Sequence, residues 1–283
     1  MVGCTPSASP SPGAVVHVVA TTTVFADFVG EVGGDRVSVR SLVPAGGEPH
    51  TFDPRPSDVI AFAEADLVVL NGLGLDDWAV DLVSEAGSHA PVLRLAEDLP
   101  GADYIADEED GGTNPHLWLN VAYAIGYVDR IAAALAEVDP GGEVGYAQRA
   151  AEYAAELESL DAFARDMLAA IPAELRRVVA FHDAFPYFAS AYGLEVVGTV
   201  VEAPGQDPSA GQVAALIDAI RESGARAILG EDQFPSELVD QIAAETGVAV
   251  VADLYSDSLG DPPGDSYAGM IRWDVERITE ALR

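Results

Sequence analysis

Short, continuous runs of apolar residues recur along the chain, and a helical pattern follows most of them. Val15 to Ala20 is one such run, and its residues are apolar without a break instead of alternating apolar and polar. Strands of this type are buried on both faces, which is typical of parallel sheets covered by helices. The sequence therefore predicts an α/β fold with doubly wound parallel sheets. Strands are expected over residues 15–20, 36–43, 66–70, 92–95, 178–181, 194–201, 225–230 and 248–252.

The longest helical pattern lies midway along the chain and divides it into two halves. Apolar side chains recur at steps of three and four residues until Pro172 ends the run. About 25 helical residues would extend roughly 38 Å, enough to cross two lobes. We expect an N-terminal α/β lobe at residues 14–141, a linker helix at 142–172 and a C-terminal α/β lobe at 173–283. The apolar stripe of this helix should comprise Tyr146, Ala150, Tyr153, Leu157, Leu160, Phe163 and Met167.

The charge of the chain limits its partners. The 283 residues carry a formal net charge of −33, and every basic side chain is an arginine. An acidic chain of this kind repels nucleic acid, which is itself a polyanion. Its charge favours solubility and can also enrich cations near a binding site. No run of eighteen or more apolar residues appears, so we expect no membrane-spanning segment.

The single cysteine, Cys4, cannot form an internal disulfide. It stands in V-G-C and is followed by T-P-S-A-S-P-S-P-G, which resembles the end of a bacterial lipoprotein signal and its flexible tether. The resemblance implies a lipid on Cys4 and a lipoprotein-like tether over residues 1–13, which would anchor the chain to the outer face of the cell membrane. The alternative is an incidental cysteine in a disordered start.

Three of the five histidines lie in turn-rich segments where strands of a parallel sheet should end. They are His50 in E-P-H-T-F-D-P-R-P-S-D, His116 in N-P-H-L-W-L-N and His182 in F-H-D-A-F. Neutral imidazole is the commonest protein ligand for a transition metal, and open α/β sheets bind ligands at the carboxyl ends of their strands. We therefore predict a metal site built on these three. His17, inside a strand, and His89, in a loop, are not expected to take part.

A tetrahedral site of the zinc type requires a fourth ligand. Asp253, Asp257 and Glu231 all follow strand ends in the second half of the chain, and residue chemistry alone leaves all three open. Asp183, next to His182, can either orient that imidazole or cap the following helix. We favour the helix cap.

Five segments, taken together, resemble the zinc/manganese solute-binding proteins of bacterial ABC importers. The likeness covers nearly the whole chain after the first residues. It implies two α/β lobes joined by one long helix, with the metal in the cleft between them. The segments are P-H-T-F-D-P-R-P-S-D, A-D-L-V-V-L-N-G-L-G-L-D-D-W, N-P-H-L-W-L-N, F-H-D-A-F-P-Y-F-A and D-S-Y-A-G-M-I-R-W.

The resemblance also implies roles for single residues. It places His50 and His116 on the first lobe and His182 on the second, and it selects Asp257 in Y-S-D-S-L as the carboxylate ligand. Glu231 matches a glutamate near the cleft that would act through a ligand. A monomer that captures a divalent cation and delivers it to an ABC permease would follow, and such a protein is not an enzyme.

The identity of the metal depends on the ligand set. Three imidazoles and one carboxylate favour Zn²⁺ over Mn²⁺, with iron third, because manganese-selective relatives often have a glutamate in the place of His182. Against zinc, the segment A-D-E-E-D-G-G lacks the histidines that many zinc-handling relatives carry before the second ligand. The alternative function is a metal-dependent hydrolase with three histidines on zinc and Glu231 as base, although no H-E-x-x-H or G-x-S-x-G is present.

Overall fold

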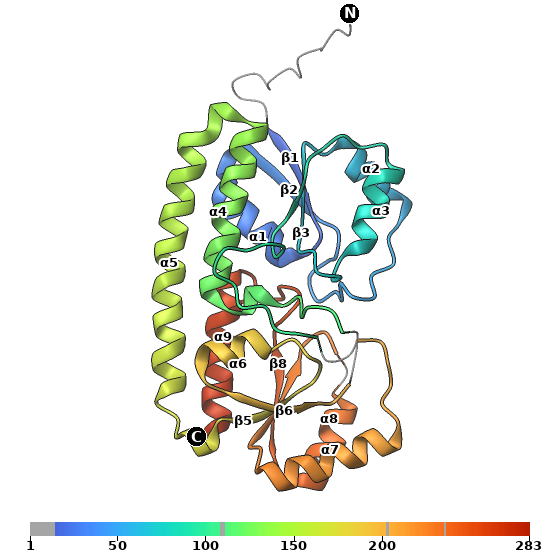
Figure 1. The fold of residues 1–283 in the computed structure, drawn as a ribbon, viewed down its shortest axis with the longest axis vertical. Helices are drawn as coiled ribbons and strands as arrows, with labels where there is room; N and C mark the ends of the chain where they lie inside the picture. Colours follow the sequence, from blue (N-terminus) through green and yellow to red (C-terminus); the bar gives the residue numbers. More distant parts are fainter. Residues whose placement is uncertain (1–14, 108–110, 202–203, 235) are drawn as a thin grey trace, which may run out of the picture.

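The computed structural model describes residues 15–107, 111–201, 204–234 and 236–283. Cys4 and the tether expected over residues 1–13 lie outside this part of the chain. Within the described ranges, no helix combines the length and the apolar character that a membrane span requires. The chain forms two α/β lobes, stacked one above the other, with one long helix running beside both (Figure 1).

The first lobe is built on a four-stranded parallel sheet in the order β2-β1-β3-β4. Val18 in the middle of β1 pairs with Val39 of β2 on one side and Leu67 of β3 on the other. The strands are β1 (Val16–Ala20), β2 (Val37–Ser41), β3 (Leu67–Leu70) and β4 (Val92–Arg94). The helices are α1 (Thr23–Gly33), α2 (Pro56–Glu64), α3 (Asp77–Glu85) and α4 (Val121–Val138), with the short 3₁₀ helices η1 (Gly34–Arg36), η2 (Leu117–Leu119) and η3 (Pro140–Gly142).

The second lobe repeats this topology, with its parallel sheet in the order β6-β5-β7-β8. As in the first lobe, the first strand of the lobe is central and the second lies at an edge. The strands are β5 (Arg177–Ala180), β6 (Glu195–Thr199), β7 (Ala227–Glu231) and β8 (Ala249–Leu254). The helices are α6 (Pro186–Tyr192), α7 (Ala210–Ser223), α8 (Glu237–Thr246) and α9 (Tyr267–Leu282), and the 3₁₀ helix η4 covers Ala173–Leu175.

The predicted fold class is confirmed. Both sheets are parallel, and each of the eight expected strands is present with ends that differ by no more than two residues. The continuous apolar runs made this prediction possible, because strands buried on both faces need no polar positions.

Helix α5 (Glu143–Ala169) runs along both lobes and packs on α4 and α1 of the first and on α9 and α6 of the second (Figure 1). Its fully buried stripe ends in Ala164 and Leu168, and Phe163 and Met167, which were expected in the stripe, are partly buried and pack against the same core. At 3.6 residues per turn, steps of four keep the stripe on one face, and Phe163 falls at its edge. There its ring is covered by the guanidinium of Arg272, 4.4 Å from the ring centre.

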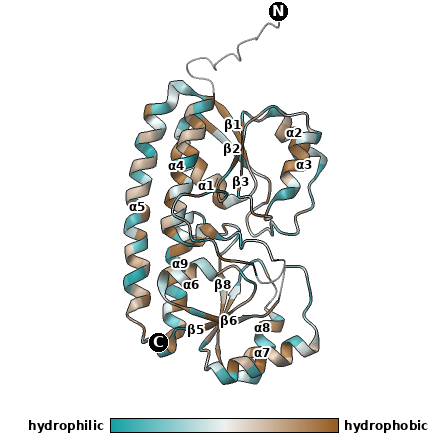
Figure 2. Cartoon of the chain, viewed as in Figure 1, coloured by the Kyte–Doolittle hydropathy of each residue, from teal (hydrophilic) through white to brown (hydrophobic). Residues whose placement is uncertain are grey.

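One continuous hydrophobic core joins the two lobes on the side of α5. It contains buried side chains from β1 and β5 as well as from α1, α4, α5 and α9, and the opposite face of each sheet has a smaller cluster of its own. Figure 2 colours each residue by its hydropathy: the strands are mostly hydrophobic, whereas hydrophilic and hydrophobic residues are mixed along α5. The lobes are therefore packed together along one side, and relative motion is restricted there.

The start of α9 is bonded to the first lobe through Asp27 on α1. The carboxylate of Asp27 accepts the backbone N–H of Tyr267 at 3.0 Å, and the hydroxyl of Tyr267 donates to the carbonyl of Trp118 at 2.7 Å. Burial raises the pKa of Asp27 to about 6, and the backbone hydrogen bond from Tyr267 only partly offsets this effect. The contact between the lobes therefore contains an acid that titrates near neutral pH.

This pKa predicts a pH-dependent stability that Asp27→Asn should abolish. The folded protein binds the proton of Asp27 more tightly than the unfolded chain does, because the pKa is about 6 in the folded state and 3.8 in the unfolded state. The contribution of Asp27 to the free energy of unfolding is therefore fully present below pH 3.8 and is lost as the pH rises through 6. Between pH 7.5 and 5, wild type should gain about 1–2 kcal/mol more unfolding free energy than the variant, measured by urea denaturation. Parallel pH curves for the two proteins would contradict the role of Asp27.

Candidate metal centre

The structure brings four of the predicted residues into one group between the lobes. Each of His50, His116, His182 and Asp257 offers one ligand atom, and these atoms all lie within 4.8 Å of one another. His116, His182 and Asp257 are almost fully buried, and His50 is partly exposed. Neither His17 nor His89 belongs to the group.

Local sequence explains how each side chain reaches this place. His50 lies within the proline- and glycine-rich loop between β2 and α2, and His116 immediately precedes η2. His182 follows the end of β5 by two residues, and Asp257 follows the end of β8 by three. The carboxyl ends of both sheets point toward the gap between the lobes, so their loops supply the side chains that meet there.

The distances within the group match the spacing around a metal ion. The Nε2 atom of His116 lies 3.2 Å from Nε2 of His50 and 3.4 Å from Nε2 of His182. The carboxylate oxygens of Asp257 lie 3.4 Å from Nε2 of His116 and 3.4 Å from Nε2 of His182. A tetrahedral ion with bonds of about 2.0–2.1 Å holds its ligand atoms about 3.3 Å apart. The four side chains are therefore arranged for one shared cation.

Two of the imidazoles are oriented by oxygen acceptors on their outer side. Nδ1 of His116 lies 3.0 Å from the side-chain oxygen of Asn114, and Nδ1 of His182 lies 2.9 Å from the carboxylate of Glu231. Because both oxygens accept, each Nδ1 carries a proton, and in the neutral imidazole each Nε2 turns its lone pair toward the centre. This is the tautomer that binds a metal ion.

Glu231 connects the end of β7 with the loop after β8. One carboxylate oxygen accepts from His182, and the other accepts a short hydrogen bond from the hydroxyl of Ser256. Both Glu231 and Ser256 are buried. The glutamate thus fixes His182 and the residue before Asp257 with the same carboxylate.

Asp183 does not cap the helix that follows it, so our preferred interpretation was wrong. Helix α6 begins with Pro186 and has no side-chain cap, because Phe185 occupies the cap position. The carboxylate and the carbonyl of Asp183 instead accept hydrogen bonds from the side-chain amide of Asn114, at 3.0 and 2.7 Å. Asp183 therefore acts on His116 through Asn114, and it does so from the other lobe.

Residues 256–259, which we call the aspartate turn, are held by both lobes. From the first lobe, the indole N–H of Trp118 donates to the carbonyl of Ser256 at 2.9 Å, and the hydroxyl of Thr23 accepts the N–H of Leu259 at 2.7 Å. From the second lobe, Gln233 donates to Asp257 at 3.2 Å. The two contacts from Trp118 and Thr23 exist only while the two lobes are together, so the position of the turn that carries Asp257 depends on both lobes.

Sequence reasoning missed Asn114, Trp118, Gln233 and Ser256, which orient the group without belonging to it. Asn114 and Trp118 stand inside the N-P-H-L-W-L-N segment, and Ser256 stands next to Asp257. Their proximity to the histidine and the aspartate was visible in the sequence, but their partners lie far away along the chain.

Burial and charge act in opposite directions on the titratable groups of the centre. Burial lowers the pKa of His50 to about 3. Burial also disfavours the charged form of His182, but Glu231 and Asp257 outweigh it and hold the pKa of His182 well above its usual value. In the same way His182 and His116 overcome burial and hold the pKa of Asp257 well below its usual value. An arriving cation must displace the proton of His182, so affinity should fall with falling pH.

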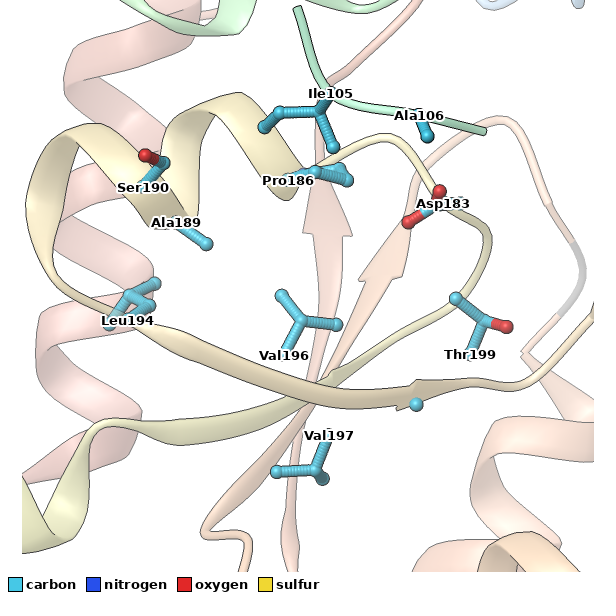
Figure 3. A pocket seen from close by; sticks show the side chains of 11 residues that line it. Ile105, Ala106, Asp183, Pro186, Ala189, Ser190, Leu194, Val196, Val197 and Thr199 are labelled. Carbon is cyan, nitrogen blue, oxygen red and sulfur yellow. The ribbon is translucent and has the colours of Figure 1, made fainter. Parts of the chain in front are cut away.

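A cavity of about 730 Å³ lies elsewhere in the second lobe, between α6, β6 and residues 105–106 (Figure 3). Most of the residues that line it have aliphatic side chains, and Asp183, on the loop between β5 and α6, is the one charged residue among them. None of the four side chains of the metal centre lines this cavity. It is therefore separate from the cation site.

Fold and site together define a class of protein: a two-lobed binding protein with a divalent metal site between its lobes. A family model described as "ZnuA: Zinc-uptake complex component A periplasmic" matches residues 18–281. The chain belongs to this family of metal-binding solute-binding proteins of ABC transporters, as its motifs predicted. The family is not enzymatic, which confirms that expectation and makes the hydrolase alternative wrong.

The names of similar proteins refer to different metals. The manganese-binding lipoprotein MntA of Halalkalibacterium halodurans is 29% identical over 99% of this chain and 93% of MntA. The iron ABC transporter substrate-binding lipoprotein MtsA of Streptococcus pyogenes is 30% identical over 94% of this chain and 89% of MtsA. The solved structure of the periplasmic zinc-binding protein TroA of Treponema pallidum is 29% identical, with a TM-score of 0.87 over 95% of this chain and 99% of TroA. The family thus establishes metal binding without a preference for zinc.

The double role of Glu231 gives a testable prediction for Glu231→Gln. Glutamine keeps an oxygen that accepts from His182, but it removes the charge that makes the imidazole more basic. Metal affinity should fall by about 10- to 100-fold, measured by competition with a chelator.

The exposed Glu222→Gln on α7 removes the same charge far from His182 and should leave the affinity unchanged. Equal affinities for all three proteins would show that Glu231 does not support the centre.

Proposed function

We propose that this chain captures a divalent transition metal ion outside the cytoplasm, with zinc preferred over manganese, and delivers it to the permease of an ABC importer. The observation that carries the proposal is the convergence of three imidazole nitrogens and a carboxylate within 4.8 Å of one another, with four contacts among them at 3.2–3.4 Å. In the proposal His50, His116, His182 and Asp257 are the metal ligands.

The preference for zinc follows from the chemistry of these four groups. Zinc has no geometric preference from its d electrons and is commonly held by four ligands, among which imidazole is frequent. Manganese prefers more oxygen ligands than a set of three imidazoles and one carboxylate supplies. The oriented Nε2 atoms of His116 and His182 support binding of an imidazole-preferring ion.

Capture and lobe closure are one equilibrium in this proposal. His50 and His116 come from the first lobe, and His182 and Asp257 come from the second, so an ion that binds all four favours the closed arrangement. Release follows when the permease separates the lobes, because this breaks the hydrogen bonds of Trp118 and Thr23 to the aspartate turn. Asp257 then loses its position together with the ion.

The same proposal places the protein at the outer face of the membrane as a monomer. Both MntA and MtsA are named as lipoproteins, and Cys4 with the residues that follow it offers the matching attachment site. A lipid on Cys4, in turn, would keep the captured ion close to the permease.

Titration of the metal-free protein with zinc and with manganese tests this function. We expect about one ion per chain, tighter binding of zinc, and a loss of more than about 100-fold in zinc affinity for His116→Ala, since the ion would keep only three ligands.

His89→Ala serves as the control, because His89 is an exposed histidine outside the group. Zinc affinity that is unchanged in His116→Ala, or reduced equally in His89→Ala, would refute the proposed ligand set.

A further inference from the structure

The segment N-G-L-G-L-D-D-W, residues 71–78, runs from the end of β3 into α3 and supplies none of the four side chains of the metal centre. It nevertheless reaches both histidine loops of the first lobe. The side-chain amide of Asn71 donates to the carbonyl of Pro115 at 2.9 Å, and the indole N–H of Trp78 donates to the carbonyl of Pro49 at 3.1 Å. Each proline immediately precedes a histidine of the centre. One segment therefore holds the backbone next to both first-lobe histidines.

Asn71 is itself fixed by buried partners. Its side-chain oxygen accepts from the hydroxyl of Tyr127 on α4 at 2.7 Å, and its backbone N–H donates to the carboxylate of Asp76 at 2.8 Å. The same carboxylate accepts the hydroxyl of Thr21 at 2.7 Å and the backbone N–H of Gly72 at 2.9 Å. All of these residues are buried. A buried polar network whose members are paired makes its surroundings rigid, so the amide of Asn71 has a fixed direction.

The backbone between Asn71 and Asp76 is strained. Leu73 has a φ of 56°, in the left-handed region that side chains other than glycine disfavour, and the glycines on either side of it have φ values of 82° and 89°. Strained residues persist where the surrounding structure over-determines them, and they are concentrated near functional sites. Here the strained turn lies between the two residues whose hydrogen bond closes the network.

The contacts of Asn71 and Trp78 lie wholly within the first lobe. The two histidine loops also bond to the second lobe, through the N–H of Gly46 and the side-chain amide of Asn114, and those bonds require the lobes to be together. The aspartate turn likewise depends on donors and acceptors of the other lobe. Separation of the lobes therefore removes support from the aspartate turn but leaves the contacts of Asn71 and Trp78 to the histidine loops.

We propose that Asn71 and Trp78 are positioning residues that hold His50 and His116 as a preformed pair, which binds the ion before the second lobe supplies its ligands. The inference rests on the proposed function and deepens it. The Nε2 atoms of the pair lie 3.2 Å apart, close to the separation of about 3.3 Å around a tetrahedral ion. Groups that are held in their bound positions beforehand lose less freedom on binding and so bind more tightly.

A purely structural role for Trp78 makes a different prediction. Trp78→Phe keeps an aromatic ring against Phe52, whose ring centre lies 4.8 Å away, and removes the N–H donor. Trp273→Phe is the matched control, because the indole N–H of this half-buried tryptophan also donates to a backbone carbonyl, that of Asp253, at 2.7 Å. If both hydrogen bonds only stabilise the fold, both variants lower the unfolding free energy and neither changes the zinc affinity of the folded protein.

The test is chelator competition for zinc in a protein that keeps only the pair, His182→Ala/Asp257→Ala. We expect this pair protein to bind one zinc ion weakly, and we expect the further change His50→Ala to abolish that binding. Trp78→Phe should lower the zinc affinity of the pair protein by about 10-fold or more, whereas Trp273→Phe should change it by less than about 3-fold. Circular dichroism checks that each variant is folded.

The same comparison in the otherwise unchanged chain covers the case in which the pair protein does not fold. There, too, we expect Trp78→Phe to lose about 10-fold or more in zinc affinity and Trp273→Phe to lose less than about 3-fold. Asn71→Ala should reproduce the loss seen with Trp78→Phe, because it removes the other contact to a histidine loop.

Three results would overturn the inference: a folded pair protein that binds no zinc, equal zinc affinities for Trp78→Phe and Trp273→Phe, or a folded Asn71→Ala variant with unchanged zinc affinity. Wild-type protein that binds no zinc would instead refute the proposed function itself, so the two failures are distinguishable.

Discussion

Three imidazole nitrogens and a carboxylate lie within 4.8 Å of one another in a largely buried site, with four contacts among them at 3.2–3.4 Å, and the rest of the structure is arranged around this group. Lone pairs at such distances repel unless a proton or a cation lies between them. Asn114 and Glu231 nevertheless turn the imidazoles so that the lone pairs converge. The protein therefore holds a centre that a divalent cation completes.

The two lobes are connected differently on their two sides, which determines how such a centre can open. Beside α5 a continuous hydrophobic core spans both lobes and resists separation. At the metal centre the lobes meet mainly through hydrogen bonds, including those of Trp118 and Thr23 to the aspartate turn and that of Asn114 to Asp183. Polar contacts of this kind are exchanged for water at little net cost. In the proposed function, opening would therefore begin at the site, with the core still packed.

Sequence reasoning succeeded where one segment carries its own signal. Continuous apolar runs predicted the strands, and turn-rich segments at strand ends predicted the three histidines that meet. It failed where the answer depends on distant partners. Residue chemistry could not choose among the three acids: Asp253 pairs with Arg277, Glu231 binds His182 and Ser256, and Asp257 alone remains in the group. Asp183 was misread for the same reason, because its partner Asn114 lies 69 residues earlier.

A crystal structure of the zinc-loaded protein, with the ion located by its anomalous scattering, tests the central claim most directly. The account predicts one ion between the lobes, within about 2.0–2.2 Å of an imidazole nitrogen from each of His50, His116 and His182 and of an oxygen of Asp257. Zinc bound at another place, or bound here with one of these four side chains turned away, would contradict it.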